Sequence, residues 1–143
     1  MDLLNKITNG IVMDHIKAGL GIKLYDYLGF KNAPFTVALI TNAASRKLGL
    51  KDIIKIENIV DLDYTVLGLI DNNITVSIIE NGQITSKSKL NLPQRVQDVI
   101  MCKNPRCITS IEKHIPHIFT LKDAGIKRYG CVYCEETVEN FQL

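Results

Sequence analysis

The four cysteines of the chain are confined to its last third, at positions 102, 107, 131 and 134. They form two pairs, Cys102-x4-Cys107 and Cys131-x2-Cys134, separated by 23 residues. Zinc in structural sites prefers four tetrahedral thiolate or imidazole ligands, and two short chelating loops supply them economically. The spacing therefore predicts that both loops close around one zinc ion. Because four protein ligands leave no open coordination position, the predicted site is structural rather than catalytic.

Other interpretations of the cysteines and of two nearby histidines stay open at this point. Two disulfides are rare in a reducing compartment, and a Cys-x2-Cys redox pair would leave the first cysteine pair unexplained. His114 and His117 could each replace a thiolate, but they lie far along the chain from either pair, so we interpret them as bystanders. A zinc deaminase needs a His-x-Glu motif and a Pro before Cys-x-x-Cys, whereas Gly130 precedes Cys131.

The segment just ahead of the cysteines predicts a domain boundary. Pro93 lacks a backbone donor and favours an extended conformation at Leu92. We place the boundary at Gln94, which divides the chain into residues 1–94 and 95–143. A domain of fewer than about 55 residues rarely forms a stable core without a disulfide, a metal ion or another cross-link. Metal binding is therefore expected to supply much of the folding free energy of the second domain. Within it, a helical turn is expected at residues 94–98, and strands at 99–101, 115–121 and 128–133.

The first part of the chain alternates between short β-rich runs and helical stripes. Leu20, Leu24 and Leu28 recur every four residues, which predicts a helix that stops at Gly29. Asp61 is a good N-cap for a second, short helix. Strands are predicted at residues 10–16, 34–41, 52–57, 74–80 and 83–87, with a turn at 42–45 and a tight Asn81-Gly82 hairpin between the last two strands.

This order of elements is that of the split βαβ, or ferredoxin-like, arrangement with one extra strand. The predicted fold class is α+β: an N-terminal ferredoxin-like antiparallel sheet with two helices, followed by a small all-β zinc-binding domain. The helices are expected on one face of the sheet. The opposite face is then left for a ligand, a loop or another subunit.

Polar residues in three strands are expected to converge at the rim of this sheet. Asp14-His15 ends the first strand, Lys55 lies in the third, and Lys87 ends the last. Lysines meet phosphate groups as point charges, and a carboxylate accepts hydrogen bonds from a ribose or a base. Taken singly, each residue also fits a solvated strand position or a strand-end turn.

Charge and motif content argue against several other classes. Residues 1–94 carry 10 basic and 9 acidic side chains, and residues 95–143 carry 7 and 6, so neither part has the strong basic excess of a sequence-independent nucleic-acid binder. The sequence contains no phosphate-binding or hydrolase motif and no pairing of a nucleophile with a base. No apolar run is long enough to span a bilayer, and no secretory signal is visible, so we expect a cytoplasmic protein without a membrane partner.

Taken together, these pieces resemble the regulatory chain of aspartate carbamoyltransferase over nearly the full length. The resemblance implies a chain without catalytic activity whose ferredoxin-like domain binds nucleoside triphosphates, with CTP and UTP typically inhibiting and ATP activating. It further implies a C-terminal domain that holds one zinc with four cysteines and docks on the catalytic chain, and regulatory homodimers, joined through the N-terminal domain, that bridge catalytic trimers. The segments that carry it are residues 10–16, 51–58, 92–95, 102–108 and 131–135.

The resemblance also implies roles for individual residues. Ser77 and Gly82 depart from the best-known members, which have an Asn and a Tyr at these positions, so the base-reading edge of the pocket is altered. Asn104 lies in the loop that the family uses near the catalytic chain. The zinc ligands are Cys102, Cys107, Cys131 and Cys134, and the positions at or beside the nucleotide are Ile7, Val12, Asp14, His15, Lys51, Lys55, Ser77 and Lys87.

Two hypotheses from other classes compete with this interpretation. A nucleic-acid-binding zinc ribbon would share the cysteines, but it predicts a basic surface with interleaved aromatic residues. A small metalloenzyme or redox protein would need an open zinc position or a thiolate of lowered pKa.

Overall fold

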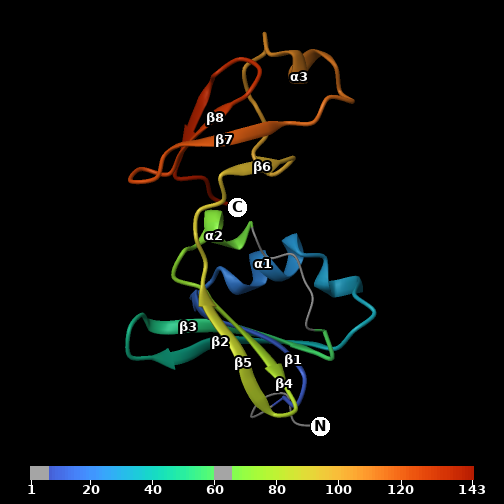
Figure 1. Cartoon of the computed structure of the whole chain (residues 1–143), viewed down its shortest axis with the longest axis vertical. Helices are drawn as coiled ribbons and strands as arrows, with labels where there is room; N and C mark the ends of the chain where they lie inside the picture. The colour runs from blue at the N-terminus through green and yellow to red at the C-terminus, as the bar shows by residue number, and fades with distance from the viewer. Residues whose placement is uncertain (1–6, 60–65) are drawn as a thin grey trace.

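The computed structural model describes residues 7–59 and 66–143, which form two antiparallel sheets joined by a short linker (Figure 1). The first sheet has five strands in the order β2-β3-β1-β4-β5, which is the predicted ferredoxin-like order with β5 added at one edge. Its strands are β1 (Gly10–Lys17), β2 (Val37–Ser45), β3 (Gly49–Glu57), β4 (Thr75–Glu80) and β5 (Gln83–Lys89).

The helices of this part lie on the side of the sheet that faces the second sheet (Figure 1). They are α1 (Gly21–Tyr27), the 3-10 turn η1 (Phe30–Asn32) and α2 (Leu67–Ile70). Gly29 follows α1 at φ 71°, a left-handed conformation that glycine adopts without strain, so the predicted helix stop is confirmed. The predicted N-cap Asp61 lies outside the described residues.

A hydrophobic core fills the space between the sheet and these helices. Alternate residues of β1 and β3 point into it, because successive side chains of a strand face opposite sides. Tyr25 and Phe35 both pack against Phe30 in T-shaped contacts. The buried members are Ile11, Met13, Ile16, Leu24, Phe30, Ile54, Ile56, Leu67, Ile74 and Val76.

Two turns of the first sheet illustrate how its register is set. Asn81 and Gly82 have φ values of 54° and 77°, the two positive values that a type I′ turn requires, so the predicted hairpin is confirmed. The predicted turn at residues 42–45 is wrong. β2 continues to Ser45, because Asn42 takes a positive φ within a register shift and the chain then resumes pairing with β3.

A buried carboxylate ties the start of α1 to the sheet. Asp52 of β3 is fully buried and accepts hydrogen bonds from the backbone N–H groups of Gly19, Gly21 and Asn42 at 3.0, 2.9 and 3.0 Å. Hydrogen bonds to a charged group contribute about 1.5–3 kcal/mol each. Asp52 therefore fixes the loop that follows β1 and the bend within β2.

The second sheet has four strands in the order β6-β7-β8-β9, with one helical turn, α3 (Ile108–Ile111). The strands are β6 (Arg95–Gln97), β7 (Ile118–Asp123), β8 (Arg128–Cys131) and β9 (Thr137–Glu139). The predicted helical turn at residues 94–98 and the predicted strand at 99–101 are wrong. Arg95–Gln97 is itself the strand, because pairing with β7 places the buried Val96 opposite the buried Phe119.

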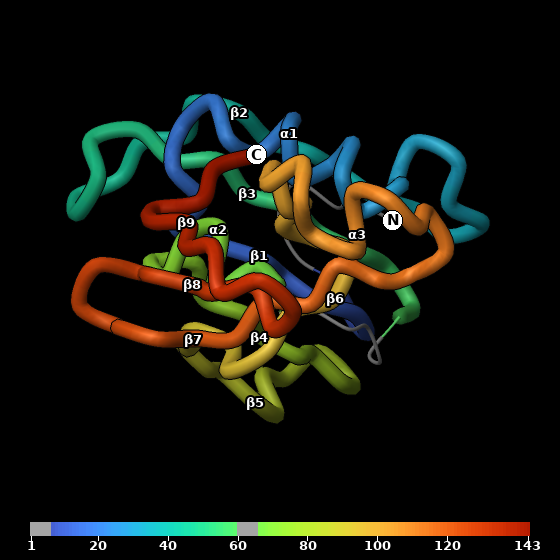
Figure 2. Tube along the Cα trace, turned by 90° about the horizontal axis from the view of Figure 1, so that it is seen from above, coloured from blue at the N-terminus to red at the C-terminus, as the bar shows by residue number. Residues whose placement is uncertain are grey.

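The two parts share packing at their junction. Leu67 of α2 lies in the first core, whereas Leu69, two residues later, lies in the second core with Val96, Phe119 and Tyr129. The Tyr129 hydroxyl donates a hydrogen bond of 2.6 Å to the carbonyl of Pro93 in the linker. The last residues of the chain run back over the first part (Figure 2), where Leu143 packs against the first core.

Candidate metal centre and ligand pocket

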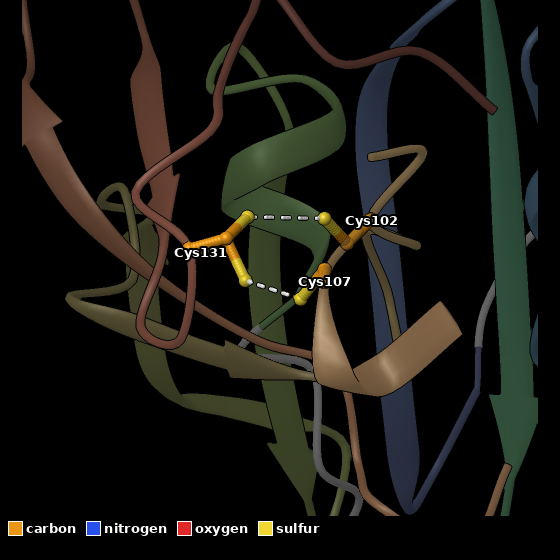
Figure 3. Close-up of side chains that lie close together, drawn as sticks. Cys102, Cys107 and Cys131 are labelled. Atoms are coloured by element: carbon orange, nitrogen blue, oxygen red, sulfur yellow. Dashed lines mark hydrogen bonds between the residues drawn. The ribbon is translucent and has the colours of Figure 1, made fainter. Parts of the chain in front are cut away.

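The four cysteines converge at the centre of the second core. All four are free thiols, and their Sγ atoms lie within 4.8 Å of one another. Figure 3 shows the side chain of Cys107 pointing toward that of Cys131 from the opposite loop, with Cys102 beside them. The Sγ atoms of Cys102 and Cys134 are 3.6 Å apart, and those of Cys107 and Cys131 are 3.8 Å apart. The predicted cluster is thus assembled, and the two-disulfide interpretation is wrong.

Local hydrogen bonds hold the loop that carries the first two cysteines. The Asn104 carbonyl accepts hydrogen bonds from the Cys107 N–H and the Ser110 hydroxyl, at 3.0 and 2.7 Å. Its side-chain oxygen accepts another from the Arg106 N–H at 3.0 Å. Asn104 therefore shapes the cysteine loop itself.

Two residues that sequence analysis did not assign to the metal site support the cysteines. The buried Thr109 hydroxyl donates to the Cys107 Sγ at 3.1 Å, and this bond is the main cause that lowers the pKa of the Cys107 thiol to about 7. The His117 Nδ1 atom accepts a hydrogen bond of 3.0 Å from the Cys102 N–H. Neither His117 nor His114 belongs to the metal-ligating groups of the described residues. A threonine two residues after a cysteine gives no recognisable sequence signal.

Burial shifts the pKa of two other thiols of the cluster upward. It raises the pKa of Cys102 to about 12 and raises that of Cys131 as well. Four thiolates in contact would repel one another strongly, and a divalent cation removes that repulsion when it displaces the protons. The arrangement thus suits a metal ion held by four sulfurs.

A second site lies on the face of the first sheet that points away from the helices. Lys55 of β3 lies opposite Val12 of β1, Val12 lies opposite Ser77 of β4, and Ser77 lies opposite Lys87 of β5. Directly opposed residues of antiparallel strands share a face, so the four form one row across the sheet. Three strand spacings of about 4.8 Å separate the Cα atoms of the two lysines by about 14 Å.

The cavity over this row has a polar end and an apolar end. Its volume is about 410 Å³. On one side of the row, Asp14 lies opposite Thr75; on the other, Ile79 lies opposite Ile84 beside Ile7 and Gly82. Sequence analysis missed four further lining residues, because isoleucine and threonine are common in strands and give no signal of a site. They are Ile53, Thr75, Ile79 and Ile84.

The residues predicted for a nucleotide site therefore fall into two groups. Those that line this cavity are Ile7, Val12, Asp14, Lys55, Ser77 and Lys87. Lys51 and His15 do not line it and instead contact Asp14. The structure brings all eight to one region of the sheet, while their role in nucleotide binding stays a prediction.

The Asp14 carboxylate is held from two directions. The Lys51 ammonium lies 3.0 Å from Oδ1 and 3.2 Å from Oδ2, and the His15 N–H donates to Oδ1 at 2.6 Å. Burial alone would raise the pKa of the Asp14 carboxyl, but these contacts outweigh it and hold the pKa below its ordinary value. Asp14 is thus an ionised acceptor at the polar end of the cavity.

A larger cavity of about 920 Å³ lies at the junction of the two parts, between the end of β1, the β2–β3 hairpin and the last two residues. Its lysines, Lys17 and Lys23, are both exposed at its margin. No row of opposed polar residues crosses this cavity, and we assign no ligand to it.

The fold and the two sites define a class: a ferredoxin-like domain with an open, lysine-bearing sheet face, joined to a small four-cysteine metal-binding domain. Residues 3–91 match the family model for the allosteric domain of the aspartate carbamoyltransferase regulatory chain, and residues 94–143 match the model for its metal-binding domain. The chain therefore belongs to the family of aspartate carbamoyltransferase regulatory chains and is a regulatory, non-catalytic chain.

Similar curated proteins agree with this assignment. An aspartate carbamoyltransferase regulatory chain of Clostridium botulinum is 59% identical over 133 residues, covering 93% of this chain and 91% of the relative. The regulatory chain of Clostridium tetani is 58% identical over 134 residues, covering 93% of each chain. That of Bifidobacterium longum is 42% identical over 133 residues, covering 93% of this chain and 96% of the relative. These matches favour the regulatory-chain interpretation over the zinc-ribbon and metalloenzyme hypotheses.

None of the helices in the described part of the chain has the length and apolar character needed to cross a bilayer.

Proposed function

We propose that the cavity on the open sheet face binds nucleoside triphosphates, namely CTP, UTP or ATP, as allosteric ligands. The observation that carries the proposal is the row from Lys55 through Val12 and Ser77 to Lys87. Two lysines line the cavity, one from β3 and one from β5, so a polyanion above the row would lie between them.

The two ends of the cavity offer different contacts to a ligand. The ionised Asp14 repels phosphate but accepts hydrogen bonds from ribose hydroxyl or base amino groups. The apolar end, which includes Ile7, Ile79 and Ile84, offers a surface on which a base can pack. Ser77 and Gly82 stand where the resemblance implies an Asn and a Tyr, so we propose that the base-reading edge of this pocket differs from that of the best-known members.

Regulation requires that the ligand bind two states of the assembly with different affinity. A ligand shifts an equilibrium only by the difference in its binding free energies for the two states. Couplings of this kind are typically about 1–3 kcal/mol and reciprocal. The packing of Leu67 and Leu69 into different cores supports α2 as one physical connection between the ligand-binding domain and the metal-binding domain.

We further propose that the metal is one structural zinc per chain, held by Cys102, Cys107, Cys131 and Cys134. A tetrahedral ion with Zn–S bonds of 2.3 Å requires sulfurs about 3.8 Å apart. The two sulfur–sulfur separations of 3.6 and 3.8 Å fit that requirement. Bound zinc would cross-link the two cysteine loops and neutralise the thiolates. Thr109 and His117 would hold Cys107 and Cys102 in place through their hydrogen bonds.

The metal-binding domain is proposed to dock on the catalytic chain of aspartate carbamoyltransferase. Large apolar side chains are exposed directly beside the cysteine loops, among them Ile111 with 61% of its surface exposed. Clustered apolar exposure of this kind typically marks a protein interface. The surface proposed to meet the catalytic chain comprises Met101, Ile108, Ile111, Val132 and Tyr133, and is called the docking surface below.

A homodimer through the N-terminal domain is proposed to form by pairing of β2 edges. β2 (Val37–Ser45) is a nine-residue edge strand without a charged residue, whereas the opposite edge, β5, carries Lys87 and Lys89. Natural proteins protect free edge strands with charges, particularly lysines, so the uncharged edge suits pairing with a second copy. Sedimentation equilibrium of the isolated zinc-loaded chain is expected to give about twice the 16.0 kDa chain mass. A mass of 16.0 kDa at micromolar concentration would contradict this proposal.

We place the division between the ligand-binding and metal-binding domains at Gln94, and the protein in the cytoplasm. The linker at residues 90–94 separates the last strand of the first sheet from the first strand of the second, which supports this division. Four free thiols arranged for a metal ion suit a reducing compartment.

The experiment that tests the proposed function is a nucleotide titration of the complex reconstituted with the catalytic chain. The rate of carbamoyl transfer is measured at each nucleotide concentration. CTP, UTP and ATP are added separately at subsaturating aspartate. At least one of them is expected to change the activity of the complex without affecting the isolated catalytic chain. Activity that is unchanged with all three nucleotides would overturn the proposal.

A further inference from the structure

The four cysteines of the metal centre lie in unequal surroundings. Cys102, Cys107 and Cys131 are buried, with 7%, 1% and 1% of their surface exposed, and belong to the second core. Cys134 is partly exposed and packs against that core from its edge. It also lies outside any strand, because β8 ends at Cys131 and β9 begins at Thr137. A reagent in solvent therefore reaches Cys134 more readily than the other three cysteines.

Cys107 is held by two donors from a single residue. Its Sγ atom accepts a hydrogen bond of 3.1 Å from the Thr109 hydroxyl and another from the Thr109 backbone N–H. Thr109 is itself only 1% exposed, so water does not compete for its hydroxyl. A buried hydroxyl that lost this partner would be left unsatisfied, which is costly. Both donors of Thr109 therefore stay on the sulfur of Cys107.

Two further sulfurs receive backbone donors, and the fourth does not. The Asn104 N–H donates to the Cys102 Sγ, and the N–H groups of Tyr133 and Cys134 donate to the Cys131 Sγ. Within residues 7–59 and 66–143, the polar contacts of the Cys134 sulfur are with other cysteine sulfurs, among them that of Cys102 at 3.6 Å. Cys134 thus gives a donor to the cluster without receiving one from a backbone or hydroxyl group of the described residues.

We propose that Cys134 is the opening ligand of the metal centre: its thiolate leaves the ion first and reacts first with a soft electrophile, whereas Cys107, tied to Thr109, leaves last. The inference rests on the proposed zinc site. Zinc binding deprotonates all four thiols, so their reactivity then depends on exposure and on the intrinsic nucleophilicity of each sulfur. Hydrogen bonds to a ligand atom withdraw electron density from it and fix its orientation. Cys134 lacks both the burial and the donors that protect Cys107.

The chemistry of this step connects Cys134 with the docking surface. With iodoacetamide, the Cys134 sulfur forms a bond to the methylene carbon while the carbon–iodine bond breaks and iodide leaves. The anionic ligand becomes a neutral thioether, whereas zinc ligation requires the thiolate. Val132 and Tyr133, two residues of the docking surface, lie between Cys131 and Cys134. A loop freed at Cys134 therefore holds these two residues less firmly.

Limited alkylation of the zinc-loaded full chain tests the order of opening. One equivalent of iodoacetamide is added to the chain without its catalytic partner, and samples are quenched over time. Peptide mapping by mass spectrometry locates the label, and a chromogenic chelator records zinc release against a blank without reagent. Cys134 is expected to carry the first label, about tenfold more of it than Cys107. Labelling of Cys107 is expected to follow the release of zinc.

Variants of Thr109 test its part in this order. Thr109→Val removes the hydroxyl donor and nearly keeps the shape of the side chain. It is expected to raise the rate of labelling at Cys107 about tenfold and to leave that at Cys134 unchanged, because one hydrogen bond to a charged sulfur is lost. Thr109→Ser keeps the hydroxyl and should be labelled like wild type. Thr137→Val is the matched control, since Thr137 is exposed on β9.

The labelling pattern of the wild-type chain decides the inference without any variant. Label that appears first on Cys102, Cys107 or Cys131, or equally on all four cysteines, would overturn it, as would a chain that keeps its zinc and takes up no label. Labelling of Cys107 that does not change in a folded Thr109→Val variant, as checked by thermal melting, would contradict the role of Thr109. A chain that holds no zinc by elemental analysis after reconstitution would instead overturn the proposed zinc site.

Discussion

Removal of the metal by a chelator is expected to unfold residues 95–143 while the five-stranded sheet stays folded. Three of the four cysteines, Cys102, Cys107 and Cys131, are themselves part of the second hydrophobic core. Structural zinc contributes about 10–16 kcal/mol of apparent binding free energy in small zinc-finger peptides, whereas a core of this size supplies only about 3–5 kcal/mol. Without the ion, the two loops lose their link and the core loses its centre.

Amide hydrogen exchange followed by mass spectrometry separates the two parts of the chain. Peptides from β7 and β8 are expected to lose protection after chelation, and peptides from β1 and β3 to retain it. Addition of zinc should restore protection. If β7 and β8 stay protected in the metal-free chain, the metal does not stabilise this domain.

Assembly with the catalytic chain should fail together with the fold of the metal-binding domain. Size-exclusion chromatography of catalytic chain mixed with metal-free regulatory chain is expected to show free catalytic trimers. Ile111→Asp distinguishes folding from docking, because it places a charge on the docking surface without touching a cysteine. This variant should bind zinc and keep its exchange protection, yet assemble poorly. Equal assembly with and without metal would contradict the proposed role of zinc.

Local signals explain why much of the fold could be predicted from the sequence. The Asn81-Gly82 pair determines its own turn, because both residues tolerate positive φ. The cysteine spacing likewise predicts convergence of Cys102, Cys107, Cys131 and Cys134, since each short loop brings its two thiols together. The β-rich runs at residues 10–16 and 52–57 predict strands, and both lie in the interior of the first sheet.

The features that could not be predicted depend on contacts between distant segments. β6 at Arg95–Gln97 forms because Val96 meets Phe119, a pairing that nothing in the local sequence indicates. The ion pair of Lys51 with Asp14 joins residues 37 apart and needs the bulge at His15. Leu69 belongs by sequence to the first domain but is buried in the core of the second. The sequence pattern around Leu69 gives no sign of which core it joins.

Replacing Lys55 and Lys87 together by methionine is expected to weaken nucleoside triphosphate binding at least a hundredfold and to abolish the regulatory response. Each lysine that contacts phosphate contributes about 1.5–3 kcal/mol through a charged hydrogen bond. Loss of about 3 kcal/mol or more corresponds to a factor of a hundred or more in Kd. Methionine keeps the length and apolar stem of lysine, so the row across the sheet should stay intact. Calorimetry on the full chain measures Kd, and the nucleotide titration of the reconstituted complex measures the response.

A second double variant removes the same total charge from the other side of the molecule. Lys23 and Lys31 are exposed residues of α1 and η1, on the helix side of the sheet. Replacing both by methionine lowers the net charge from +2 to 0, as the first double variant does, so a nonspecific effect of charge would appear in both. We expect the control to bind and respond like wild type, and both variants to assemble normally with the catalytic chain. The salt dependence of binding should also become shallower only in the Lys55 and Lys87 variant, because a contact with phosphate is screened by salt. If that variant responds to nucleotides as wild type does, the ligand is not held on this face of the sheet.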